Sequence, residues 1–89
     1  MVFEWNERKP ARMRKHGVTF REAATVFGDP LAITFADPDH SIDEQRYLTF
    51  GVSRFSRLVV VSHVDRGERV RIISARPMTR GEKRIHEEG

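Results

Sequence analysis

The chain has 89 residues, of which 38% are hydrophobic and 33% are charged. This length allows one small hydrophobic core, so we expect a single domain over residues 1–89, folded rather than disordered. The sequence has no cysteine, which excludes disulfide bonds and thiolate metal sites and fits a reducing cytoplasm. No apolar run reaches the roughly 18 residues of a membrane span, and the acidic, aromatic start is unlike a secretory signal. We therefore expect a cytoplasmic protein that does not enter a membrane.

The net charge of +3 is unevenly distributed along the chain. Residues 1–20 carry a net charge of +3, residues 21–50 carry −4, and residues 51–89 carry +4. The basic residues are 13 arginines and 3 lysines, and arginine binds phosphate oxygens through two parallel hydrogen bonds. The bias favours a nucleic acid or another acidic partner, although a GC-rich gene produces the same bias.

The first part of the chain predicts one strand and two helices. Residues 2–5 alternate as a strand does, and residues 7–15 predict a polar helix that Gly17 ends. Thr19 and Glu22 have the spacing of a capping box, in which each side chain accepts a hydrogen bond from the other residue's backbone amide. The helix that starts there has an apolar face, formed by Phe20, Ala23, Ala24 and Phe27. We expect this second helix to pack on the core.

The rest of the chain predicts a four-stranded meander followed by a helix. The expected strands cover residues 31–35, 46–50, 58–64 and 69–75. The third of them is almost wholly apolar and β-branched, which is typical of a central strand covered on both faces. A hairpin turn is expected at residues 65–68, and a second capping box at Thr79 and Glu82 starts the last helix. Together these elements predict an α+β fold: a twisted antiparallel sheet with two N-terminal helices and a short C-terminal helix packed on it.

Three runs of residues are specific enough to indicate a family. They are Phe3-Glu4-Trp5-Asn6, Lys15-His16-Gly17-Val18 and Arg71-Ile72-Ile73-Ser74-Ala75-Arg76. With these runs, the chain resembles the BrnT family of toxins over essentially its whole length. It departs from the residues usual in that family at Asn6, Arg12 and His86.

The resemblance implies a RelE-like fold and a role in a bacterial type II toxin–antitoxin system. The toxin of such a system is a small ribonuclease that cuts RNA and thereby blocks translation. The resemblance also implies a BrnA-type antitoxin with a ribbon-helix-helix DNA-binding domain. This partner would form a heterotetramer with the toxin and make all contacts to operator DNA. No cofactor is expected.

RNA cleavage without a metal ion needs a base for the 2′-hydroxyl, an acid for the leaving 5′ oxygen and cations for the phosphate. We predict Arg46 and Arg76 as catalytic cations, because arginine keeps its charge and contacts two phosphate oxygens. Glu44 shares a strand face with Arg46, and His40 titrates near neutrality, so both are predicted acid–base residues. Further phosphate contacts are predicted at Lys15, Arg69, Arg71 and Arg80. The alternative for each arginine and for Lys15 is a solvated surface charge, for Glu44 a surface ion pair, and for His40 a hydrogen bond within its loop.

Other interpretations of single residues stay open. His63 suits a buried, hydrogen-bonded core position better than a ligand position. The histidines and aspartates lack the spacing of zinc or calcium ligands, so we predict no metal site. Trp5 and Tyr47 could stack on RNA bases or belong to the core.

Two further functions compete with the enzyme. The chain could be a non-catalytic module that binds RNA or protein, or an inactive toxin that acts only through its antitoxin. If residues 31–35 or 3–5 form a sheet edge, that edge would accept a strand or helix from a partner. We expect an acidic or amphipathic antitoxin segment to cover the face that carries the arginines.

Overall fold

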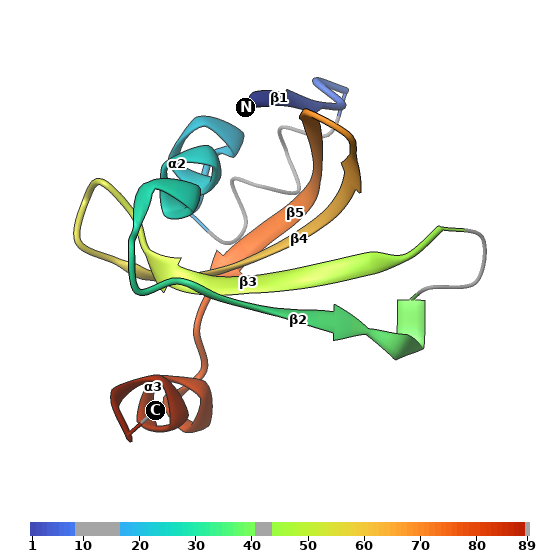
Figure 1. Ribbon diagram of the computed structural model, residues 1–89. Coiled ribbons are helices and arrows are strands. Elements are labelled where there is room, and N and C mark those ends of the chain that lie inside the picture. The colour runs from blue at the N-terminus through green and yellow to red at the C-terminus, as the bar shows by residue number, and fades with distance from the viewer. Residues whose placement is uncertain (9–16, 41–43, 89) are drawn as a thin grey trace.

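A five-stranded sheet in the order β1-β5-β4-β3-β2 forms the frame of the protein (Figure 1). The computed structural model describes residues 1–8, 17–40 and 44–88. The strands are β1 (Val2–Trp5), β2 (Ile33–Asp37), β3 (Arg46–Val52), β4 (Leu58–Arg66) and β5 (Arg69–Pro77). The helices are α2 (Phe20–Thr25) and α3 (Arg80–Glu88), with 3-10 turns η1 (Val26–Gly28) and η2 (Pro38–His40). The expected α+β class is confirmed.

The sheet is mixed rather than wholly antiparallel. Strands β2 to β5 form the expected antiparallel meander, and the β4–β5 hairpin turns at Gly67, whose φ of +65° favours glycine. β1 pairs with β5 in parallel, with Glu4 opposite Arg71. The antiparallel prediction is therefore wrong for β1. Its neighbour is a strand more than 60 residues away in the sequence, and local alternation does not reveal which strand lies beside it.

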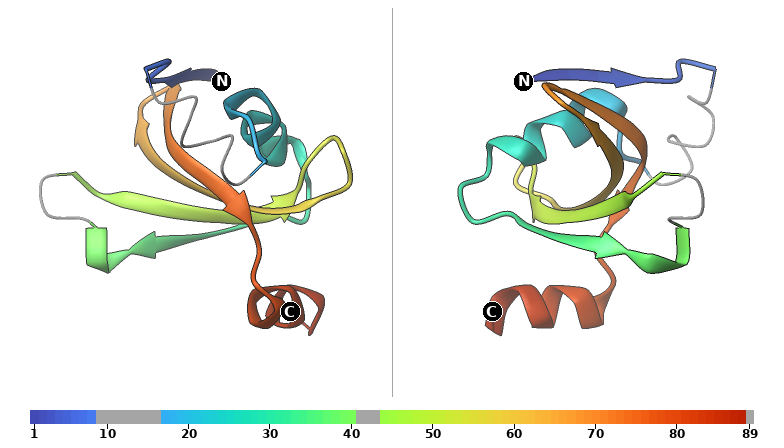
Figure 2. Two further views of the ribbon diagram at one scale, coloured as in Figure 1. Left: turned by 180° about the vertical axis from the view of Figure 1, so that it is seen from behind. Right: turned by 45° about the vertical axis from the view of Figure 1, so that its right-hand side comes forward.

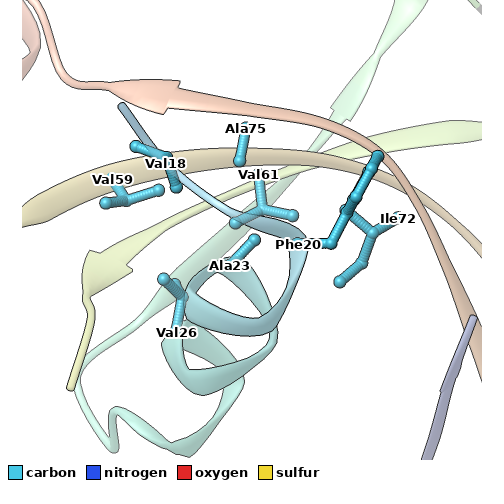
Figure 3. Close-up of a cluster of buried hydrophobic side chains, with 8 residues drawn as sticks. All are labelled: Val18, Phe20, Ala23, Val26, Val59, Val61, Ile72 and Ala75. Atoms are coloured by element: carbon cyan, nitrogen blue, oxygen red, sulfur yellow. The ribbon is translucent and has the colours of Figure 1, made fainter. Parts of the chain in front are cut away.

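The hydrophobic core lies between α2 and one face of the sheet (Figure 3). Thr19 starts the helix, because its hydroxyl accepts a 3.0 Å hydrogen bond from the backbone amide of Glu22. The buried side chains of the cluster are Val18, Phe20, Ala23, Val26, Val59, Val61, Ile72 and Ala75. The expectation of a short core helix and of a buried strand at residues 58–64 is thus confirmed.

A β-bulge interrupts the pairing of β4 with β5. Ser62 faces Ser74 and His63 faces Ile72, so Ile73 is an extra residue in β5. The bulge reverses the alternation of β5, and as a result Ile72 and Ala75 both reach the core under α2. On the other face, Arg71 is opposite Val64 and Arg76 is opposite Val60. Arg71 and Arg76 therefore share one face, which an uninterrupted strand would not allow.

The predicted arrangement of the helices is corrected. Of the two expected N-terminal helices the structure describes α2; residues 9–16 of the other lie outside the described residues. α3 forms as expected but does not pack on the sheet with α2: it lies on the opposite side and has no buried residue (Figures 1 and 2). Its single large apolar residue, Ile85, is 70% exposed. With so little apolar surface the helix has no face to bury. In the described ranges, no helix is long and apolar enough to cross a membrane.

Candidate functional site

The sheet face turned away from α2, here called the open face, carries the predicted arginines. Strand alternation and register place two kinds of side chain on it. Across β2 and β3 lies an apolar patch, the β2–β3 patch, formed by Ile33, Phe35, Leu48 and Phe50. Around the β4–β5 hairpin lies an arginine cluster, formed by Arg46, Arg66, Arg69 and Arg71. The open face thus combines apolar and strongly basic surface.

Glu4 lies among three members of the arginine cluster, Arg66, Arg69 and Arg71. Its carboxylate is 3.9 Å from Arg66, 3.8 Å from Arg69 and 3.9 Å from Arg71. These are ion pairs that are longer than hydrogen bonds. Arg69 and Arg71 are 68% and 34% exposed. Their guanidinium groups are therefore placed to donate to an added anion.

Glu44 is bound by Arg66, which belongs to β4 and lies 22 residues away in the sequence. Its two oxygens accept hydrogen bonds of 2.9–3.1 Å from Nε and Nη2 of Arg66. These hydrogen bonds, and then the charges of Arg66, Arg46 and Arg71, lower the pKa of the Glu44 carboxyl. Glu44 is ionised at neutral pH, but the lowered pKa makes it a weaker base and its oxygens are already bonded to Arg66.

Arg76 is bound at the far end of the open face. Its Nη1 and Nη2 atoms donate to the two Glu82 oxygens at 2.7 and 3.0 Å. Glu82 also completes the predicted capping box: it accepts a hydrogen bond from the Thr79 amide at 2.8 Å, and its own amide donates to Thr79 Oγ1 at 3.2 Å. The Arg76 hydrogen bonds, with smaller contributions from the Thr79 amide and the Arg76 charge, lower the pKa of Glu82 to about 2. Glu82 thus joins the start of α3 to β5.

We expect the attachment of α3 to be lost in acid. Because the pKa of Glu82 is lowered in the folded protein, its stabilisation is complete above the ordinary value of 4.5 and is lost as the pH falls through about 2. Glu82→Gln should loosen α3 already at neutral pH. Chemical shifts of α3 amides, followed by NMR from pH 6 to pH 1.5, will report both effects. Glu87→Gln, on the same helix, is the matched control; equal titration curves for the two variants would contradict the assignment.

The sequence-predicted residues fall into two groups. Glu44, Arg46, Arg69 and Arg71 meet at the hairpin end of the open face. Arg76 and Arg80 lie at the other end, where β5 leads into α3. Two predicted residues are not placed: Lys15 lies outside the described residues, and so does the side chain of His40. The backbone at His40 follows Asp37, the register partner of Arg46, and so lies at the end of β2 near the first group.

Sequence reasoning missed Glu4 and Arg66 as parts of the site. Arg66 sat in a predicted turn, whereas β4 continues to it. Glu4 joins the cluster through the parallel pairing of β1 with β5. Its alternation with Phe3 and Trp5 marks it as a residue of the opposite face. The face of Glu4 could therefore be predicted from the sequence, but the pairing of β1 with β5 could not.

A chain of polar side chains with a buried centre lies on the other face, under α2. Asp65 Oδ1 is 2.7 Å from His63 Nδ1, and His63 Nε2 is 2.7 Å from Thr49 Oγ1, which is 2.7 Å from Thr34 Oγ1. The order hydroxyl, histidine, carboxylate resembles a nucleophilic triad. His63 and Thr49 are each only 1% exposed, however, and substrate does not reach them. The interpretation of His63 as a satisfied core residue is confirmed.

Comparison with protein families gives a match to a described family. The model of the family described as "Ribonuclease toxin, BrnT, of type II toxin-antitoxin system" matches residues 5–82. A comparison with curated proteins found no match. In the described part of the chain, no group of three or more histidine, cysteine, aspartate or glutamate residues could hold a metal ion. Because the match spans most of the sequence and includes the strands that form the open face, the chain belongs to the BrnT family of ribonuclease toxins of type II toxin–antitoxin systems.

Proposed function

We propose that this toxin cuts RNA by attack of a 2′-hydroxyl on the adjacent phosphate, without a metal ion, and that the arginine cluster holds that phosphate. The observation that carries the proposal is the state of Arg69 and Arg71. Both guanidinium groups pair with the Glu4 carboxylate at 3.8–3.9 Å, which is too long for a hydrogen bond. Their N–H donors are therefore available to phosphate oxygens. Fixed donors aimed at developing negative charge are the main source of rate enhancement in such reactions.

We assign the catalytic roles of Arg46, Arg71 and Glu44 from their positions in the cluster, and that of His40 from the chemistry of its imidazole. Arg46 and Arg71 stabilise the pentavalent phosphate. Glu44 takes the proton of the 2′-hydroxyl after phosphate draws Arg66 away from it, and His40 protonates the leaving oxygen. Support for Glu44 comes from its place beside Arg66, Arg46 and Arg71, at the predicted position of the phosphate.

Arg76, predicted from the sequence as a catalytic cation, is bound to Glu82 at the other end of β5, and we infer that it binds, with Arg80, the RNA strand away from the scissile bond. The bulge in β5 puts Arg76 on the same face as Arg69 and Arg71. A single RNA strand laid along β5 therefore meets Arg71 and Arg76, roughly 15 Å apart at about 3.3 Å per residue. Phosphate would compete with Glu82 for Arg76. We include Lys15 as a further phosphate contact on the basis of its charge.

The first test is a denaturing-gel cleavage assay on naked single-stranded RNA with excess EDTA. The protein is purified free of its partner and checked for folding by circular dichroism. We expect EDTA-resistant cutting, and we expect Arg71→Ala to slow it by at least tenfold because a phosphate donor is lost. Arg76→Ala should have a smaller effect. Arg21→Ala, an exposed arginine on α2 and so off the open face, is the matched control.

The other outcomes separate the remaining possibilities. Cutting that stops in EDTA would show a metal-dependent enzyme. RNA binding without cutting, by a folded wild-type protein, would show a non-catalytic binding module. No effect on naked RNA but cutting in the presence of translating ribosomes would show that the ribosome completes the site. Equal rates for Arg71→Ala and Arg21→Ala would remove the arginine cluster from the reaction.

Membership in a type II toxin family implies a cognate antitoxin. We propose that it is a BrnA-type protein with a ribbon-helix-helix domain, that the two form a heterotetramer, and that operator DNA is bound through the antitoxin alone. The toxin then acts on RNA in the cytoplasm when the antitoxin is absent. In the described part of the chain, β1 and β2 are the edge strands of the sheet, and each has backbone groups on its outer side to which an antitoxin segment could bind. An acidic or amphipathic segment would cover the arginine cluster.

A further inference from the structure

Phe35 presents an aromatic ring to solvent on the open face. Its side chain is 55% exposed, and the ring of Phe50 holds it edge to face, with the centroids 5.8 Å apart and the planes at 78°. A single exposed apolar residue needs no explanation. Phe35, however, belongs to the β2–β3 patch with Ile33, which is also exposed. The patch therefore offers a fixed, accessible ring rather than a flexible apolar side chain.

The other aromatic side chains are engaged elsewhere. Trp5 stacks on Phe20 at 5.7 Å with an angle of 4°, and Tyr47 stacks on the buried His63 at 5.9 Å. The suggestion that Trp5 and Tyr47 stack on bases therefore finds no support, because both contact residues on the α2 side of the sheet. Phe55 is exposed, but its ring lies under Arg54 in the loop between β3 and β4. Phe35 is the exposed ring on the face that carries the arginine cluster.

Phe35 also lies at a suitable distance from the arginines. Its register partner is Leu48, and Asp37, two residues along β2, faces Arg46. Phe35 and Arg46 are thus diagonal neighbours across two strands, roughly 7–8 Å apart. Arg71 lies two strands beyond Arg46 in the same row, at about 4.8 Å per strand. A base on Phe35 would leave its phosphate within reach of these arginines.

The charge of the same face favours RNA as the occupant. Among the described residues at the arginine cluster, four guanidinium groups face the three carboxylates of Glu4, Glu44 and the buried Asp37. An excess of positive charge beside an exposed ring on an open sheet is the combination by which proteins bind single-stranded RNA: arginines contact the backbone and aromatic rings stack on the bases.

We propose that Phe35 stacks on a base of single-stranded RNA, in the nucleotide next to the phosphate at the arginine cluster. The inference rests on the proposed function for the identity of the ligand, but it concerns binding and not the chemical step. It assigns the β2–β3 patch to substrate positioning. Stacking accepts every base, so Phe35 would hold the strand without reading its sequence.

The test is binding of a short, fluorescently labelled 2′-O-methyl oligoribonucleotide, which lacks the attacking hydroxyl and cannot be cut. We expect Phe35→Ala to raise the Kd by about tenfold or more. Phe35→Leu, which keeps the apolar side chain but removes the ring, should bind as weakly, whereas Phe35→Trp should bind as wild type and its fluorescence should be quenched. Phe55→Ala, an exposed ring off the open face, is the matched control and should bind as wild type.

Salt dependence provides a second readout. The loss caused by Phe35→Ala should be the same at low and high salt, because stacking releases no counterions, whereas Arg71→Ala should reduce the salt slope. Equal binding by wild type and Phe35→Ala would overturn the stacking role. Normal RNA binding by Phe35→Ala with loss of antitoxin binding would assign the patch to the antitoxin instead. Failure of the wild type itself to bind RNA would overturn the proposed direct contact with RNA, and this result is distinct from the first two.

Discussion

Glu22→Ala should lower the free energy of unfolding by about 3 kcal/mol, the range of a buried, hydrogen-bonded charge. Glu22 is 2% exposed. Its Oε2 atom accepts hydrogen bonds from Ser53 Oγ at 2.6 Å and from Arg57 Nε at 2.8 Å, and its Oε1 atom pairs with Arg57 Nη2. Arg57 Nη2 also donates to the carbonyl of Gly17. The carboxylate therefore holds the β3–β4 loop against the start of α2, and its removal leaves these donors without their acceptor.

Urea denaturation at pH 7 measures the effect of Glu22→Ala, and Glu87→Ala, an exposed acid on α3, is the matched control with an expected change below about 0.5 kcal/mol. The Arg57 hydrogen bonds lower the pKa of Glu22 in the folded protein. Its contribution is therefore present above the ordinary pKa of 4.5 and is lost as the pH falls below that value. As the pH falls below 4.5, the wild type should thus lose stability more steeply than Glu22→Ala. Parallel pH profiles would show that Glu22 is not linked to folding.

His63→Ala should cost a similar amount, about 3 kcal/mol, for a different reason. His63 fills a fully buried position between Phe27, at a centroid distance of 4.9 Å, and Tyr47. Its loss opens a cavity and also removes the link between Asp65 and the buried Thr49. These side chains join β2, β3 and β4. The backbone amides of the three strands should therefore become less protected from hydrogen exchange.

The His63 prediction is measured by thermal unfolding together with amide hydrogen exchange. We expect faster exchange at Thr49 and its neighbours in β3, and a lower Tm. His86→Ala, a partly exposed histidine on α3, should leave both unchanged. An unchanged Tm for His63→Ala would mean that water replaces the ring without loss of stability.

Local sequence signals predicted the local structure well. The alternation at residues 2–5, the β-branched run that begins at Leu58, and the cap at Thr19 all correspond to observed elements. Each depends on residues within one turn or one strand. A local prediction failed where a side chain bonds to a residue far away in the sequence instead of to its neighbour. Glu22 has capping-box spacing, yet its carboxylate bonds to Arg57, 35 residues away, rather than to the Thr19 amide.

The sequence predicted arginines on one face of the sheet but not the residues that pair with them, and their role in the reaction stays a prediction. Arginines were expected on this face, and Arg46, Arg69 and Arg71 lie there. The partners could not be foreseen, because Glu44 binds Arg66 across 22 residues and β1 adds Glu4 from the far end of the sequence. Arg76 shows the same limit: the spacing of Thr79 and Glu82 predicted a cap, and the cap carboxylate also holds the arginine.

The extra residue in β5 decides which side chains of this strand lie on the open face. Upstream of Ile73 the open face receives odd-numbered residues, and downstream it receives even-numbered ones. Deletion of Ile73 alone would remove the bulge and restore regular alternation, so Arg71 and Arg76 would stay on the open face and Ala75 in the core. Regular pairing through Ile73, by contrast, would exchange the faces of Arg76 and Ala75 while every residue of the sequence is kept. The charge pattern that β5 displays to RNA therefore depends on the bulge and not on amino-acid composition alone.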